Sequence, residues 1–446
     1  MASLHEKMVK LNNIETMNGP DQGVPNTLRG DAIVFNEIFI QLLILLAVSM
    51  FVIAVAKKLN QPYSIALVIV GLLLGIVHIP LLEEAETFIT QSSVFQAIVI
   101  SLFLPILLGD ATLKLPFAHL KEQGKPVLAL AFGGTLLSFL IVALAGHYVL
   151  GLPLVVAFTF GALMSATDPI SVISIFKSLG VPQKIVTIIE GESLFNDGIA
   201  VVLFQISSVY LLTYMEMGWA GIGSGLLLFL KFSLGGIAVG TVLGFVFSQL
   251  IRLYDDYPLE IAFSMLLFFG SYFIAEHFHV SGVIAVVVGG LIFGNYGARI
   301  GMSETTRTNI NSFWDVVTLI ANSLIFLMIG LEIKNINFTD KWILILAAIA
   351  IVLVARTAAL YASVFWIKHF PGSWKAILNW GGLKGSLSIA LALSLPSGFE
   401  GREDVLVLTF SVVLFSLLVQ GLSIKKLVVK LGLGGEGRGQ SKPESA

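Results

Sequence analysis

The sequence predicts an all-α polytopic membrane protein that crosses the bilayer about thirteen times. Three observations predict this fold class. Of the 446 residues, 56% are hydrophobic and 12% are charged, whereas soluble domains carry about 25% charged residues. Apolar runs close to the roughly 20 residues that a spanning helix needs recur along the chain. Finally, the few ionisable residues inside these runs gather in a small number of them.

The apolar runs divide the chain into three parts. Residues 1–33 are mixed polar and charged and are expected to form a flexible arm, and the glycine- and serine-rich residues 431–446 a short disordered tail. Between them, residues 34–430 form the predicted transmembrane domain. Its spans are expected at 34–57, 62–79, 93–110, 125–148, 152–177, 184–212, 222–252, 258–277, 280–298, 309–331, 341–366, 374–396 and 403–424.

Lysine and arginine in the loops predict the orientation of these spans. If the loops alternate between the two sides, one side receives about seventeen of them and the other about six. Cytoplasmic loops carry the excess of positive charge. The sequence therefore predicts a multi-pass protein of the cell membrane with its N-terminus outside and its C-terminus in the cytoplasm.

Charge and cysteine content exclude several kinds of partner. The formal net charge is −2, which leaves no basic footprint for nucleic acid. The chain has no cysteine, so disulfides, haem attachment and thiolate metal sites are excluded. No cofactor is expected.

Three carboxylates, Asp168, Glu192 and Asp197, lie within two neighbouring apolar spans. An ionised side chain at membrane depth costs at least ~2.5–3.5 kcal/mol on insertion scales. Any one of them alone is explained by a paired structural ion, but the three together favour an ion or proton site.

Pro169 predicts that the fifth span is broken. Proline has no N–H and pushes the preceding residue out of the α region, so the helix should break at Thr167–Asp168 and free carbonyl oxygens beside a carboxylate. A simple proline kink is the alternative. Broken backbone is tolerated at membrane depth where it is buried in protein or lines a wet cavity.

The sixth span arranges its polar residues on two neighbouring helix faces. Ser193 and Asp197 are four residues apart and share one face, and Glu192 and Asn196 share the next. Hard cations are held by oxygen ligands. Ser193, Asp197, Asp168 and a freed carbonyl oxygen are thus candidates for a cation cage.

These segments resemble a known family. The motif ATDP followed by GESLFND is similar to the paired signature of NhaP/NHE-type sodium/proton antiporters, which belong to the monovalent cation:proton antiporters. ARTAALY at 355–361 and GGLKGSLSIALALSLP at 381–396 resemble later helices of that family, and the likeness covers residues 35–430. It implies the antiporter fold, with inverted repeats, two crossed discontinuous helices and a homodimer in lipid.

The resemblance also implies roles for particular residues. It makes Asp168, Asp197, Ser193 and the backbone carbonyl of Thr167 the ligands of Na⁺ and H⁺, with Asp197 as the alternating carrier. It pairs Glu192 with Arg356 as a structural ion pair. An Asn at position 196, before Asp197, implies electroneutral exchange. The short tail contrasts with the long tails of animal members and fits a prokaryotic inner membrane.

The twelfth span is expected to break as the fifth does. Gly381, Gly382 and Gly385 surround Lys384, and interrupted spans at matching places in two halves indicate inverted repeats with a site near the midplane. Alternatively, the glycines only allow close helix contact. Lys384 stands where the family usually has arginine. It either neutralises the C-terminal ends of broken helices or compensates a site carboxylate.

Asp110 ends the third expected span, after Pro105 and Gly109. It either lines a cytoplasmic funnel or caps the helix, and the cap is slightly favoured.

Other classes of function are less consistent with these residues. A hydrolase with Ser193 as nucleophile would need a nearby His or Lys base, and the GxSxG motif is absent, so no enzyme activity is expected. A channel needs a continuous polar pore, whereas these ionisable groups gather at one depth, as alternating access requires. The predicted function is exchange of Na⁺ or Li⁺ for H⁺, and K⁺/H⁺ or broader monovalent cation exchange is the alternative.

Overall fold

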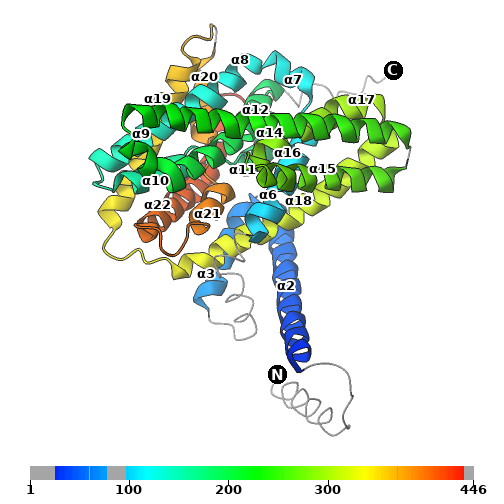
Figure 1. Ribbon diagram of the computed structural model, residues 1–446, viewed down its shortest axis with the longest axis horizontal. Helices are drawn as coiled ribbons and strands as arrows, with labels where there is room; N and C mark the ends of the chain where they lie inside the picture. Colours follow the sequence, from blue (N-terminus) through cyan, green and yellow to red (C-terminus); the bar gives the residue numbers. More distant parts are fainter. Residues whose placement is uncertain (1–25, 60, 78–96, 255, 369, 436–446) are drawn as a thin grey trace.

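A computed structural model describes residues 26–435 except 60, 78–96, 255 and 369 (Figure 1). Its regular secondary structure is entirely helical over this part of the chain, which confirms the predicted all-α membrane fold. Ten helices within the described residues are long and apolar enough to span a bilayer, and three apolar helices are shorter. The expected count of about thirteen spans is therefore approximate.

The first half of the chain forms the helices that carry the predicted carboxylates. In order they are α2 (Asn26–Lys58), α3 (Tyr63–Ile76), η2 (Ala97–Phe103), α6 (Leu104–Lys114), α7 (Phe117–Glu122), α8 (Gly124–Leu128), η3 (Ala129–Gly134), α9 (Thr135–Tyr148), α10 (Leu154–Leu163), α11 (Ile170–Leu179), α12 (Gln183–Gln205), η4 (Ile206–Tyr210) and α13 (Leu211–Glu216).

The second half begins with the longest helix, which we expected as the seventh span. The helices are α14 (Trp219–Leu253), α15 (Tyr257–His277), α16 (Gly282–Ile292), η5 (Phe293–Gly297), α17 (Ala298–Ile300), α18 (Glu304–Glu332), η6 (Ile333–Asn335), α19 (Trp342–Val364), α20 (Gly372–Gly381), α21 (Ser386–Leu393), α22 (Arg402–Phe415), η7 (Ser416–Gly421) and α23 (Leu422–Lys430).

The expected boundaries of the arm and the tail are only partly within the described residues. Helix α2 begins at Asn26, inside the segment expected to be a flexible arm. Residues 1–25 of the arm and 436–446 of the tail lie outside the described residues.

The helices pack in two bundles (Figure 1). The core bundle consists of α9–α12 and α19–α22, and the scaffold bundle of α2, α3, α6, α15, α16 and α18. Helix α14, the long green helix across Figure 1, packs mainly on α16 and α15 of the scaffold bundle. The two bundles meet where α12 contacts α16 and α6, and where α21 contacts α18.

Both expected breaks are present, and they meet in the core bundle. Helix α10 ends at Leu163 and α11 starts at Ile170, so the first break extends further than the predicted Thr167–Asp168. The second break separates α20 from α21, at residues 382–385. The backbone N–H of Asp168 donates to the carbonyl of Leu383 (2.8 Å), so each break satisfies a polar group of the other.

Glycine permits this close approach. A Cβ atom on Gly385 would overlap the side chain of Asp168, and one on Gly382 would lie 2.7 Å from the guanidinium of Arg356. The glycines of the twelfth span therefore lie at a helix break, as expected, so the alternative that they only allow close contact is wrong, although they allow close contact as well.

Candidate ion-binding site

A cavity of about 750 Å³ leads to the crossing of the broken helices. Its walls come from both bundles: α11, α12 and α21 on one side, and α6 and α18 on the other. The mouth of the cavity is lined by residues near helix ends on one side of the molecule: Lys57, Lys114, Lys177 and Gln183. Asp168 and Asp197 also line it, so both predicted carboxylates face one compartment.

Each of these carboxylates has a buried oxygen that no other described residue satisfies. Oδ1 of Asp168 accepts a hydrogen bond from the backbone N–H of Ile170 (3.0 Å), at the start of α11. Oδ2 of Asp168 and Oδ1 of Asp197 are buried and have no hydrogen-bond partner of good geometry among the described residues, although the backbone N–H of Ser386 lies beside the Asp168 carboxylate. Buried acceptors normally have a partner, so two unsatisfied oxygens in one cavity indicate a place for a proton or a cation.

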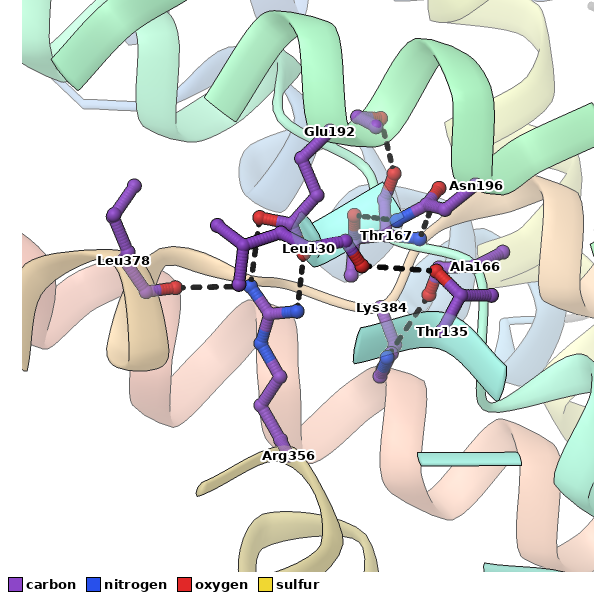
Figure 2. Close-up of polar contacts among 10 residues, drawn as sticks. Leu130, Thr135, Ala166, Thr167, Glu192, Asn196, Arg356, Leu378 and Lys384 are labelled. Atoms are coloured by element: carbon purple, nitrogen blue, oxygen red, sulfur yellow. Dashed lines mark hydrogen bonds and ion pairs between the residues drawn. The ribbon is translucent and has the colours of Figure 1, made fainter. Parts of the chain in front are cut away.

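Thr167 is held to α12 by two side chains. Oγ of Ser193 donates to the carbonyl of Thr167 (2.5 Å), and Nδ2 of Asn196 donates to its hydroxyl (2.7 Å; Figure 2). The carbonyl that we expected as a cation ligand thus already accepts one hydrogen bond. The Ser193 oxygen still has acceptor capacity, because a hydroxyl carries two lone pairs.

Glu192 and Arg356 form a buried two-pronged ion pair (Figure 2). Nη1 of Arg356 contacts Oε1 of Glu192, and Nη2 lies 3.1 Å from Oε2. Nη2 also donates to the carbonyl of Leu378 in α20 (3.1 Å). The guanidinium therefore joins α19, α12 and the first half of the broken twelfth span.

Lys384 contacts the other break. Its Nζ donates to the carbonyl of Ala166 (3.0 Å), which follows the end of α10, and its side chain is buried (Figure 2). Its backbone N–H donates to Oγ of Ser416 (2.9 Å). Of the two roles considered from sequence, this contact favours neutralising the C-terminal end of a broken helix.

The cavity wall contains further polar residues, of which the sequence analysis singled out Asp110 but not those of α18. Asp110 lines the cavity and pairs with Lys114, so it belongs to the funnel that we had weighed slightly below a helix cap. Asp315, Thr318 and Asn322 of α18 line the same wall. Asn322 had a detectable signal, because an amide inside an apolar span is unusual and needs a partner.

Two broken helices that cross beside buried carboxylates, at the end of a cavity open to one side, define a secondary transporter that works by alternating access. Comparison with known proteins identifies its kind. The family model described as "Sodium/hydrogen exchanger, transmembrane" matches residues 44–430, and the chain belongs to this family.

The chain is also similar to individual antiporters. It is 69% identical over 399 residues to the Na⁺/H⁺ antiporter NhaH of Halobacillus aidingensis, covering 90% of this chain and 99% of the relative. It is 61% identical over 391 residues to the Na⁺/H⁺ antiporter NhaG of Bacillus atrophaeus, covering 88% and 74%.

Among solved structures, the fold matches the sodium proton antiporter MjNhaP1 from Methanocaldococcus jannaschii. The TM-score is 0.72 at 22% sequence identity, and the match covers 90% of this chain and all of that chain. This agreement confirms the expected antiporter fold.

Proposed function

We propose that this protein exchanges Na⁺ or Li⁺ for H⁺ across the membrane. The observation that carries the proposal is the pair of buried carboxylate oxygens, on Asp168 and Asp197, that end the cavity without a hydrogen-bond partner of good geometry among the described residues. The names of the relatives, Na⁺/H⁺ antiporters at 69% and 61% identity, support it.

Asp197 is the proposed alternating carrier, and Asp168 is the second carboxylate of the site. A proton or an alkali cation neutralises the charge on these oxygens, and the two compete because they need the same lone pairs. Ser193 contributes its hydroxyl oxygen, and the Thr167 carbonyl lies beside it. Only the neutralised site crosses the membrane, since an unneutralised carboxylate is costly at that depth.

Four side chains support this site without carrying the ion. Glu192 and Arg356 anchor the helices around it, Asn196 fixes Thr167, and Lys384 holds the first break. Asn196 stands before Asp197, as in the family members that exchange one ion for one proton, and on that resemblance the proposed exchange is one for one and electroneutral.

Alternating access follows from the two bundles. The core bundle, which holds both breaks, moves against the scaffold bundle, which also forms a homodimer contact in the membrane. The lysine-rich mouth of the cavity supports an orientation in which this conformation is open to the cytoplasm, with the N-terminus outside and the C-terminus inside.

Proteoliposomes with an imposed pH gradient test the function. Na⁺, Li⁺ and K⁺ are added separately while internal pH is followed, with and without an ionophore. We expect Na⁺ and Li⁺ to move protons and the ionophore to leave the rate unchanged. Because protons compete with the cation, the KM for Na⁺ should rise as pH falls. A response to K⁺ alone would favour K⁺/H⁺ exchange, and no response to any cation would overturn antiport.

Asp197→Asn tests the carrier. The amide cannot take up a proton or carry a charge to be neutralised, so cation-dependent proton movement should disappear while expression persists. Asp340→Asn is the matched control: Asp340 is exposed in a loop at φ +63°, a conformation that asparagine also accepts, and exchange should be unchanged. Retained exchange in Asp197→Asn would refute the carrier role.

A further inference from the structure

The scaffold wall of the cavity carries its own polar cluster, opposite the transport site. Lys114 ends α6, and its Nζ contacts both the Asp110 carboxylate one turn earlier and Oδ1 of Asp315 on α18 (2.6 Å). Asp110 is buried, whereas Lys114 is 34% exposed and Asp315 lies at the solvent-exposed mouth. One ammonium therefore bridges two carboxylates on this wall of the cavity.

The cluster continues inward along one face of α18. Asp315, Thr318 and Asn322 are spaced three and four residues apart, so they share that face. The Thr318 hydroxyl lies beside the Asp110 carboxylate. Asn322 lines the same cavity, is 1% exposed, and its Oδ1 has no hydrogen-bond partner among the described residues.

The chemistry of these oxygens is that of a hard-cation site. Carboxylate, hydroxyl and amide oxygens are the ligands of alkali and alkaline-earth cations, and a buried amide oxygen without a partner has acceptor capacity to spare. The two carboxylates outnumber the single ammonium, so the cluster keeps a net negative charge when all three are ionised. A cation that moves from the mouth to Asp168 and Asp197 passes this wall.

We propose that Asp110, Thr318 and Asn322 form a second monovalent-cation site, on the scaffold wall, and that the Lys114 ammonium occupies its outer part as a tethered competitor. The role in transport rests on the proposed function; the site itself does not. The cation binds here before it reaches the core bundle, and Asp315 draws Lys114 away toward the mouth when it does. The site thereby sets the KM for cations supplied from the cavity side.

Neutralising Lys114 tests the competitor. In proteoliposomes with Na⁺ on the cavity side, Lys114→Met should lower the KM for Na⁺ by about two- to fivefold, the range expected for a partly exposed charge pair. Lys114→Arg keeps the charge and should keep the KM. Lys114→Gln, a shorter neutral variant, is made alongside so that a packing defect in one variant does not decide the result.

Lys177→Met is the matched control. Lys177 also lines the cavity but belongs to the core bundle, where it lies 3.6 Å from Glu190. If its neutralisation lowers the KM as much as that of Lys114, the effect is the general field of the cavity and the proposal is wrong. An unchanged KM in folded Lys114→Met and Lys114→Gln also overturns it.

A binding measurement separates this proposal from the transport function. In an Asp168→Asn/Asp197→Asn background, which disables the transport site, radioactive Na⁺ should still bind the detergent-solubilised protein. Adding Lys114→Met should tighten this binding, and adding Asp110→Asn with Asn322→Leu should abolish it, at unchanged size-exclusion elution. Absence of binding in the background overturns the second site. Absence of exchange in the wild-type protein overturns antiport instead, and leaves this binding result interpretable.

Discussion

Arg356 carries its charged guanidinium in the middle of the apolar helix α19, and its contacts with other buried groups explain why the charge is stable there. Arg356 is 7% exposed. Glu192, whose two carboxylate oxygens accept from Nη1 and Nη2 of Arg356, is 2% exposed. Arginine suits this position because its planar fork matches a carboxylate and leaves another N–H for the Leu378 carbonyl. A buried pair of this kind stabilises little in net terms, but removing one partner strands the other charge.

Arg356→Ala should therefore lose folded protein. Breaking a buried pair typically costs about 3–5 kcal/mol, and Glu192→Ala should cost a similar amount. The double variant Glu192→Leu/Arg356→Met removes both charges and should recover part of the loss. The measurement is the thermal unfolding midpoint in detergent, together with yield.

Arg252→Ala serves as the control for this series, because Arg252 is exposed at the end of α14. It should change neither yield nor the midpoint. If both single variants of the pair match the wild type in stability and transport, the pair has no structural role.

Two helix breaks, rather than any single side chain, create the site at the scale of elements. The expected breaks followed from Pro169 and from the glycines around Lys384, because both residue types act on the backbone locally. The structure adds that the residues of each helix break form hydrogen bonds with the other break. The backbone N–H of Asp168 donates to the Leu383 carbonyl. In the other direction, the Ser388 hydroxyl donates to the Leu163 carbonyl (2.7 Å), and the Lys384 ammonium donates to the Ala166 carbonyl.

Gly385→Ala should disrupt the crossing. A Cβ at this position would overlap the Asp168 side chain, so the carboxylate or the break must shift, and exchange activity should fall steeply with little loss of expression. Gly270→Ala in α15 is the matched control. Its Cβ would meet nothing within 4 Å, and alanine is the better helix former, so activity and stability should be kept. Equal activity in both variants would contradict the close crossing.

Lys384→Arg and Lys384→Met separate charge from packing at the same crossing. Arginine keeps a cationic donor for the Ala166 carbonyl, and exchange should be retained. Methionine leaves that buried carbonyl without its donor, and exchange should be largely lost. Initial rates at saturating Na⁺ are the measurement. Full activity in Lys384→Met would show that the carbonyl does not need the ammonium.

At the scale of the whole molecule, the cavity opens to one side. In this conformation, ions can therefore reach the site only from the solution on that side of the membrane. The mouth of the cavity lies among Lys57, Lys114 and Lys177, on the lysine-rich side of the chain. The natural absence of cysteine makes this property accessible to labelling, since no background thiol reacts.

Ser174→Cys should react with a membrane-impermeant thiol reagent only from the cytoplasmic side, because Ser174 lines the cavity. Ser397→Cys, in the exposed connection between α21 and α22, should react only from outside. Right-side-out and inverted vesicles give the two comparisons. Labelling in the reverse pattern would invert the proposed orientation, and labelling of Ser174→Cys from both sides would contradict a one-sided cavity.

The sequence by itself determined the all-α membrane class and the break beside Asp168, because hydropathy and proline act over a turn or a span of the chain. The resemblance of its motifs added the antiporter fold and the Glu192–Arg356 pairing.

Apart from the Glu192–Arg356 pair, only the tertiary structure decided which partners the buried polar groups take. The Ser193 hydroxyl donates to the Thr167 carbonyl, and the Lys384 ammonium donates to the Ala166 carbonyl rather than pairing with a carboxylate. Lys114 of α6 forms an ion pair with Asp315 of α18. These contacts join positions from 26 to 218 residues apart, and they depend on how the helices cross. Helix crossing is set by packing between distant segments, which local patterns of residues do not encode.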